Sequence, residues 1–409
     1  MSMNRVQKKL EYRTALLNAG GDDRPNPLAP AAAGLTSRER FRKAINHEES
    51  DRVPIDVGQD LHNGIHEVAY ANLLKHLGET DDIHIYDRMQ HLAVVKESVL
   101  KRLHADTRYV FANAPAAWKL VVEADGSWGD EWGVRRKLCG SYDEAYHHPL
   151  AGCDLADVHA FRFPDPLDKT RFDGLREAAR CLHETTDYAI IAGSPATLFY
   201  LTAELMGFQE YMEKLLTDRI VIETLVERML EYWIEFFGGY LDAVGDFVEM
   251  VWMGDDWGAQ QGPIIPPTLF REIFLPRYRQ FCAFVKSRAK VKIALHSCGS
   301  VGWALEDLAN AGIDVVHPLQ GDACGMEDPE MIKRRFGDQL VFYSNLRNQT
   351  TLPHGTPEEV RQDVIRKIRA LAFGGGYVLS GGHNIQADVK PENILALFDT
   401  ACDLSELVP

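Results

Sequence analysis

The sequence has few of the features that mark exported or membrane-bound proteins. No run of about eighteen apolar residues occurs in the 409 residues, so we expect no transmembrane helix. The chain starts with MSMNRVQKKLEYRTALL, which is charged and has no apolar segment of the kind that a secretory signal needs. The seven cysteines show no paired spacing, and their odd number argues against a disulfide framework. We therefore expect a reduced, cytoplasmic protein.

Positive charge is also scarce. The 44 lysines and arginines are outnumbered by 60 aspartates and glutamates, which gives a formal net charge of -16. A surface of this sign repels phosphate backbones, so nucleic acid is excluded as a partner. The composition, 45% hydrophobic and 25% charged, is that of an ordinary globular protein. A chain of this length can form several domains or a single α/β barrel.

The chain divides into an N-terminal arm with a linker (1–35) and one large domain (36–409). Residues 4–18 have apolar side chains at helical spacing, and a stretch rich in glycine, proline and alanine follows them. The domain opens with a helix that Thr36 or Ser37 can cap, with Glu39 in its first turn. We expect residues 4–18 to form a helix, and arms of this kind often pack on a partner subunit.

Short apolar runs rich in β-branched residues alternate with longer segments of helical period. Runs that are apolar on both faces suit buried parallel strands, and eight of them indicate an α/β fold, a single (β/α)8 TIM-type barrel. A doubly wound open sheet is the alternative, but no glycine-rich nucleotide motif accompanies these runs. The eight runs are VPIDV (53–57), TRYVFA (107–112), YAIIAG (188–193), FVEMVWMG (247–254), VKIALH (291–296), IDVVHP (313–318), LVFYSN (340–345) and GYVLSG (376–381).

One segment interrupts this alternation. Residues 118–149 contain Asp-Gly and Gly-Asp turn signals between alternating runs, which is typical of a β-hairpin. Because the segment follows the second strand, we expect an insertion that lies over the C-terminal mouth of the barrel and shapes its specificity.

The active site of such a barrel lies at the C-terminal ends of its strands. Polar side chains follow most of the eight runs at that end. They are His62 and His66 after the first run, Asp255, Asp256 and Gln260 after the fourth, His296 and Cys298 after the fifth, His317 and Gln320 after the sixth, and His383 and Asn384 after the eighth.

The His296-x-Cys298 pair is the sharpest of these features. Zinc binds imidazole nitrogen and thiolate sulfur, and its catalytic sites use about three protein ligands with one open position. His383 is a candidate third ligand, and Cys324, His62 and His66 are others; Glu249 or Asp255 is a candidate fourth. The alternative is that Cys298 is a small buried hydrophobe and binds no metal.

The acidic pair Asp255-Asp256 and the three glycines at 374–376 each allow two interpretations. One of the two carboxylates can enter the pocket as a base, as a cation ligand or as a metal ligand, or the pair is a helix N-cap and a solvated charge. The glycines precede a strand and do not open a helix, so they indicate a helix end and turn in place of a phosphate site.

Four segments together resemble the uroporphyrinogen decarboxylase superfamily. They are LTSRERFRKAINHEESDRVPID, GDDWGAQQGPIIPP, LHSCGSV and GGGYVLSGGHNIQADVKPENI, and they occur in the family's order from about Thr36 to Ala401. The resemblance implies the barrel fold. True decarboxylases of this superfamily carry an arginine-rich turn after the first strand, which holds substrate carboxylates. Here the turn is VGQDLH (57–62) and lacks arginine, which argues against a porphyrinogen substrate.

The other branch of the superfamily, the cobamide-dependent methyltransferases, binds zinc through H-x-C and a distant second cysteine. His296 and Cys298 match the first part of that pattern, and His383 stands where the second cysteine falls. The resemblance therefore implies zinc-assisted transfer of a methyl group between a small O-, N- or S-methyl compound and a corrinoid (methylcobamide) carried by a partner protein.

O-demethylation is the favoured form of this reaction. Zinc, or a protonated His383 or His317, would activate the ether. Asp255 completes the expected catalytic set, and the expected substrate-binding residues are His62, His66, Asp256, Gln260, Gln320 and Asn384. Superfamily precedent implies a homodimer. Two alternatives stay open: a decarboxylase of a porphyrinogen or other polycarboxylate that uses Asp255 or Asp256, and a non-catalytic barrel that binds a corrinoid protein.

Overall fold

The computed structural model describes residues 34–403. The helix predicted for 4–18 and most of the predicted linker lie outside the described residues. The predicted helix at the start of the domain is confirmed. It is α2 (Ser37–Ile45), and Thr36 caps it in a capping box with Glu39.

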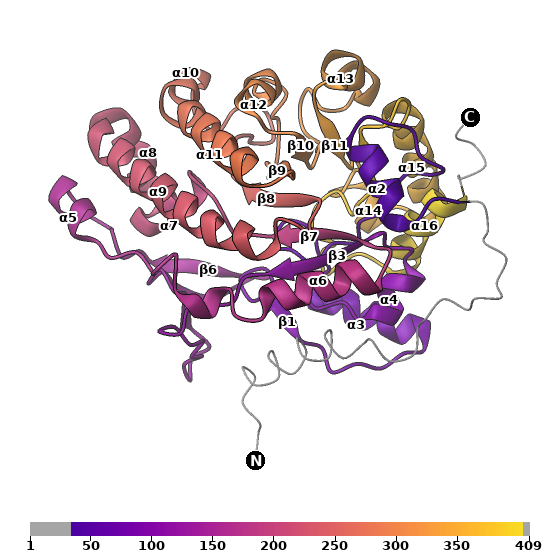
Figure 1. Ribbon diagram of the computed structural model, residues 1–409, viewed down its shortest axis with the longest axis horizontal. Helices are drawn as coiled ribbons and strands as arrows, with labels where there is room; N and C mark the ends of the chain where they lie inside the picture. The colour runs from indigo at the N-terminus through magenta and orange to yellow at the C-terminus, as the bar shows by residue number, and fades with distance from the viewer. Residues whose placement is uncertain (1–33, 404–409) are drawn as a thin grey trace.

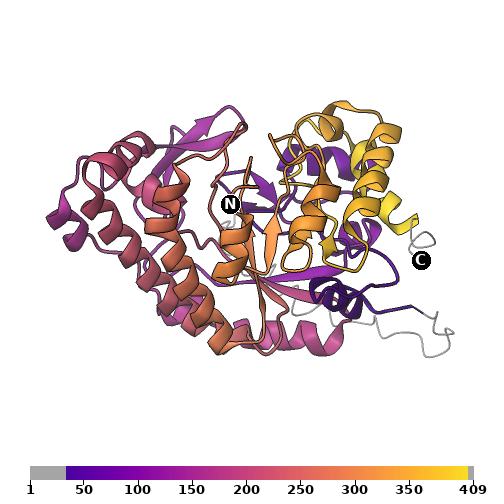
Figure 2. The ribbon, with the colours of Figure 1, turned by 90° about the horizontal axis from the view of Figure 1, so that it is seen from above.

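A curved parallel sheet forms the centre of the molecule, and helices surround it (Figures 1 and 2). Within residues 34–403 it has seven strands in the order β3-β7-β8-β9-β10-β11-β12, and all neighbours are parallel. This is the α/β architecture of a TIM-type barrel. The strands are β3 (Thr107–Phe111), β7 (Ala189–Gly193), β8 (Met250–Gly254), β9 (Lys292–His296), β10 (Val315–His317), β11 (Val341–Tyr343) and β12 (Tyr377–Val378).

The first predicted run, 53–57, is not a strand but joins the two edges of this sheet. Ile55 forms an isolated parallel bridge with Leu379, and the Asp56 N–H donates to the Leu379 carbonyl at 2.9 Å. On the other side the Asp106 N–H donates to the Ile55 carbonyl at 2.8 Å, directly before β3. The segment therefore hydrogen-bonds to both edges of the curved sheet.

The sheet buries side chains on both of its faces, as the apolar runs predict. Every residue of β7 and β8 is buried. Side chains inside the barrel form their own cluster, which includes Tyr109, Trp252 and Tyr343. Phe41 and Ile45 of α2 belong to the same cluster. Since α2 packs on the strands from this side, it covers the N-terminal end of the barrel interior.

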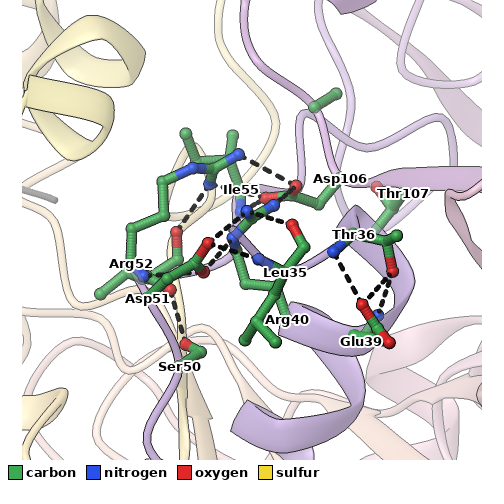
Figure 3. Close-up of polar contacts among 12 residues, drawn as sticks. Leu35, Thr36, Glu39, Arg40, Ser50, Asp51, Arg52, Ile55, Asp106 and Thr107 are labelled. Atoms are coloured by element: carbon green, nitrogen blue, oxygen red, sulfur yellow. Dashed lines mark hydrogen bonds and ion pairs between the residues drawn. The ribbon is translucent and has the colours of Figure 1, made fainter. Parts of the chain in front are cut away.

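An ion-pair network fixes this end of the barrel (Figure 3). Arg40 pairs with Asp51 and with Asp106, at 2.7 Å in each case. Arg52 pairs with the second oxygen of Asp106 at 2.7 Å, and the Ile55 N–H donates to that oxygen at 2.8 Å. Asp106 is fully buried, and these partners offset the desolvation cost of its charge. The network ties α2 and the segment 51–55 to the start of β3.

Helices connect the strands and cover the outside of the sheet. The longest, α9 (Arg219–Val244), packs against α11, α5, α8 and α6. Within the described part of the chain, no helix combines the length and the apolar character needed to cross a bilayer. The remaining helices are α3 (Glu67–Leu77), α4 (Glu97–Arg102), α5 (Leu155–Ala160), α6 (Leu175–Thr185), α7 (Tyr200–Met206), α8 (Phe208–Thr217), α10 (Pro267–Leu269), α11 (Leu275–Arg288), α12 (Leu305–Ala311), α13 (Pro329–Phe336), α14 (Thr351–His354), α15 (Pro357–Leu371) and α16 (Pro391–Asp403).

The segment 118–149 contains a small antiparallel sheet. Its strands are β4 (Trp128–Gly129), β5 (Arg135–Cys139) and β6 (Tyr142–His147), in the order β4-β5-β6. The pair β5–β6 corresponds to the predicted hairpin, and β4 adds a third strand. The Tyr142 hydroxyl donates to Gln386 Oε1 at 2.7 Å, so the insertion contacts the segment that follows the last barrel strand. A two-stranded sheet, β1 (Ile85–Asp87) with β2 (Leu92–Ala93), precedes β3.

Candidate functional site

Three side chains of types that can bind a metal meet at the carboxyl ends of the barrel strands. His296 is the last residue of β9, Cys298 follows it by two residues, and His383 follows β12. One donor atom from each lies within 4.8 Å of the other two, and residues 34–403 contain no second group of this kind. The Cys298 Sγ is 3.3 Å from His296 Nε2. Imidazole nitrogen and thiolate sulfur are both donor types that zinc binds in proteins.

A tight turn after β9 brings Cys298 into this group. Gly299 adopts a φ of 79°, and a Cβ there would lie 2.3 Å from the Gly258 carbonyl oxygen, so only glycine fits. The N–H of Cys298 donates to Asp256 Oδ1 at 2.8 Å, and the N–H of Gly299 donates to Gln320 Oε1 at 2.8 Å. Asp256 and Gln320, expected to bind substrate, therefore hold the cysteine turn in place.

Burial disfavours the charged form of three imidazoles at the site. Burial, together with the neighbouring imidazoles His62, His317 and His383, holds the pKa of His296 well below its usual range. Burial, together with His383 and His62, does the same to the pKa of His317, and burial lowers the pKa of His383 to about 4. Neutral imidazoles can bind a metal, but they cannot donate a proton as imidazolium. The lowered pKa values therefore disfavour the predicted role of a protonated His317 or His383.

The surroundings of Cys298 disfavour the ionised form of its thiol. Its burial and the nearby carboxylate of Asp256 raise its pKa well above the usual range. A coordinated metal ion removes the proton from such a thiol. The chemistry of Cys298 thus fits a metal ligand better than a free nucleophile.

His62 lies on the inner side of this group and is oriented by Asp60. Its Nδ1 is 2.5 Å from Asp60 Oδ1, and its ring lies between Trp252 and His296, with centroids 5.4 and 5.0 Å away. A Cβ on Gly254 would lie 2.3 Å from Nε2, so His62 fits only because residue 254 is glycine. Nε2 is buried and has no hydrogen-bond partner. When Nδ1 donates to Asp60, the neutral form of this ring presents a lone pair at Nε2.

Asp60 was not among the candidate site residues predicted from the sequence. It is fully buried, and its second oxygen accepts the Ser194 N–H at 3.1 Å. The Asp-x-His spacing is the signal that identifies it, since a carboxylate two residues from an imidazole can fix the ring's tautomer.

Asp255 is a structural anchor and not a catalytic base. Its two oxygens accept the N–H groups of Leu198, Phe199 and Tyr200 at 2.8 to 2.9 Å, and the Tyr278 hydroxyl at 2.6 Å. It is 1% exposed, and these four donors occupy the carboxylate fully. The predicted roles of Asp255 as a base and as a metal ligand are therefore wrong.

Two other expected residues lie outside the site. Glu249 precedes β8, at the opposite end of that strand, and pairs with Arg42 at 2.8 Å, so it cannot be the fourth ligand. His66 is the N-cap of α3, where its Nδ1 accepts the Val68 N–H at 3.2 Å and its ring stacks on His91. Helix capping, and not substrate binding, accounts for the position of His66.

The remaining expected residues hold loops together. The Gln260 amide donates to the Asp322 carbonyl, and Cys324 is exposed. Asn384 donates to the Leu61 carbonyl at 3.0 Å and to Gln90 Oε1 at 2.6 Å, which joins the His383 segment to the turn that carries His62. Its Oδ1 is buried without a partner.

Comparison with known proteins shows which family the chain resembles. The family model described as "Uroporphyrinogen decarboxylase (URO-D)" matches residues 145–404. The uroporphyrinogen decarboxylase of Psychromonas ingrahamii is 24% identical over 260 residues, which cover 61% of this chain and 68% of that protein. The uroporphyrinogen decarboxylase of Neisseria meningitidis serogroup C is 27% identical over 257 residues, again 61% and 68%.

One solved structure shares the fold over most of its length. A methyltransferase from Methanosarcina mazei superposes with a TM-score of 0.62 and 18% sequence identity, covering 90% of this chain and 99% of that one. At this identity the likeness is one of fold.

Proposed function

This chain belongs to the uroporphyrinogen decarboxylase family, and we propose that it is a methyltransferase of that family. Its reaction would move a methyl group between a small O-, N- or S-methyl compound and a corrinoid on a partner protein, with O-demethylation as the favoured form. The observation that carries the proposal is the convergence of His296, Cys298 and His383 within 4.8 Å. The shared fold with a protein named as a methyltransferase supports it.

The residues of the site fit a zinc ion. His296, Cys298 and His383 would supply three ligands, and the fourth position would be open to substrate because Asp255 and Glu249 are engaged elsewhere. When bound, zinc supplies a Lewis acid that stabilises negative charge on the atom from which the methyl group departs.

The chain's own residues would orient the substrate. Asp60 fixes His62 so that the lone pair of Nε2 is unpaired in a buried position, where it can accept a hydrogen bond from a hydroxyl or amine of the substrate. Methyl transfer would leave the electron pair of the old bond on the demethylated atom, and the corrinoid of the partner protein, when present, would supply the pair for the new bond. The demethylated atom would keep the old pair and would take up a proton from solvent.

Decarboxylation is the second candidate, and the names of the curated relatives favour it. A porphyrinogen carries several carboxylates, which need guanidinium or ammonium partners. The turn 57–62 carries the carboxylate of Asp60 and no arginine. In addition, Asp255 has no free oxygen for catalysis. Consumption of uroporphyrinogen under anaerobic conditions would support this candidate over methyl transfer.

The test of the proposed function is direct. The purified protein is incubated with a reduced corrinoid protein and a panel of methyl ethers, methylamines and methyl thioethers, and methyl-cobalt absorbance is followed. We expect formation with at least one donor, loss in Cys298→Ala, and retention in Cys324→Ala, which removes an exposed cysteine outside the site. Absence of methyl-cobalt with every donor would contradict the proposal.

A further inference from the structure

We propose that His317 is a positioning residue that sets the tautomer of His296 and so frees His296 Nε2 to bind the metal. The inference rests on the proposed function, since it concerns the same metal site. It replaces the acid role that the sequence suggested for His317.

The contact between the two imidazoles carries the inference. His296 Nδ1 and His317 Nδ1 are 2.9 Å apart, a distance at which two nitrogens share one hydrogen. The opposite nitrogen of His296, Nε2, faces Cys298 Sγ at 3.3 Å and is therefore the atom that belongs to the metal group. A ligating Nε2 carries no hydrogen, so Nδ1 of His296 must carry one and donate it. His317 Nδ1 must then be the acceptor.

The fold holds His317 in the orientation that this role needs. It is the last residue of β10, its backbone is in register with His296, and its carbonyl accepts the Ser297 N–H at 2.6 Å. The ring is fully buried, with Trp252 and Tyr343 against it at centroid distances of 5.2 and 5.8 Å. A ring enclosed in this way cannot easily rotate to present its other nitrogen.

An imidazole is an unusual partner for a metal-binding histidine. Such ligands usually donate their second N–H to a carboxylate, a carbonyl or water, and loss of that partner typically lowers metal affinity 10–100-fold. Here His317 supplies an uncharged acceptor. The neighbouring His62, which is not in the metal group, has a carboxylate partner instead, since its Nδ1 lies 2.5 Å from Asp60 Oδ1.

Two substitutions of similar size separate this role from general packing. In His317→Asn the amide oxygen, attached to Cγ, can take the place of Nδ1; in His317→Gln the amide lies further out, near the position of Nε2. Zinc affinity is measured by competition with a chromophoric chelator, and the cobalt(II)-substituted proteins are compared by their thiolate-to-cobalt absorption. Thermal unfolding shows whether both variants are folded.

We expect the Gln variant to lose 10–100-fold in zinc affinity and to show an altered cobalt spectrum. The Asn variant should stay close to the wild type in both. Equal zinc affinity in the two variants, whether high or low, overturns the role of His317. If the wild-type protein binds neither zinc nor cobalt, the proposed metal site itself fails, and the inference fails with it.

Discussion

Replacement of Asp255 by asparagine tests whether this residue holds the site together or takes part in the reaction. The side chain keeps its size, but only one oxygen remains to accept hydrogen bonds. Of the four donors that now face the carboxylate, two would face an NH2 group instead. The affected donors include backbone N–H groups of the segment that enters α7, in which Leu198, Phe199 and Tyr200 follow one another.

The expected loss of stability follows from these contacts. A buried donor left without an acceptor costs about 1–3 kcal/mol, so two of them cost about 2–6 kcal/mol. Part of this is offset, because burial raises the pKa of Asp255 to about 6 and the neutral amide removes a charge that is costly to bury. We therefore expect a net loss in the free energy of unfolding of about 2–3 kcal/mol.

Urea unfolding followed by circular dichroism measures this loss. Asp246→Asn is the matched control, because Asp246 is 70% exposed in its pair with Arg176 and should change stability by less than about 1 kcal/mol. An Asp255→Asn protein with wild-type stability but no turnover would refute the anchor role and restore a catalytic one.

Two further predictions concern other buried groups. Gly254→Ala places a Cβ 2.3 Å from His62 Nε2, so we expect about 1–3 kcal/mol of destabilisation and strongly reduced turnover. Gly262→Ala, where no atom lies within 4 Å, should change neither; equal effects in both variants would contradict the steric argument. Burial lowers the pKa of Lys367 from 10.5 to about 8, so between these values the unfolded chain binds a proton that the folded chain does not, and stability rises with pH. From pH 8 to 10.5 the free energy of unfolding of the wild-type protein should rise by about 3 kcal/mol relative to that of Lys367→Met. Parallel plots of unfolding free energy against pH for the two proteins would show that Lys367 does not titrate in this range.

The strands of the barrel could be predicted from sequence because each is a short run that is apolar on both faces. VKIALH became β9 and YAIIAG became β7 within one or two residues. The run 53–57 is bridged to both sheet edges without becoming a strand. The apolar residues of this run predict that it is buried, as the strands are. They do not predict whether its backbone forms the regular hydrogen bonds of a strand.

Only part of the candidate site could be predicted from the sequence. The carboxyl ends of parallel strands meet at one edge of the sheet, and this rule predicted that His383 lies near His296 and Cys298 although it is far from them in the sequence. The direction in which each side chain points depends on strand stagger and loop path, which no local pattern encodes. For this reason Asp255 and Glu249 looked like ligands, although one faces a helix start and the other lies at the opposite end of its strand.

The contacts between the histidines could not be predicted from local sequence patterns either. The 2.9 Å contact between His296 and His317 arises from register between β9 and β10, and the contact of His62 with His296 arises from the path of a loop. Both contacts therefore depend on how segments far apart in the sequence are arranged in space.

Elemental analysis of the purified protein, prepared without chelator, tests the central claim most directly. We predict about one zinc per chain in the wild-type protein, with loss of the metal in Cys298→Ala and in His383→Ala. Cys324→Ala and His159→Ala, which alter exposed residues outside the site, should retain it. A wild-type protein without metal, or zinc that persists in both site variants, would contradict the account of His296, Cys298 and His383 as a metal centre.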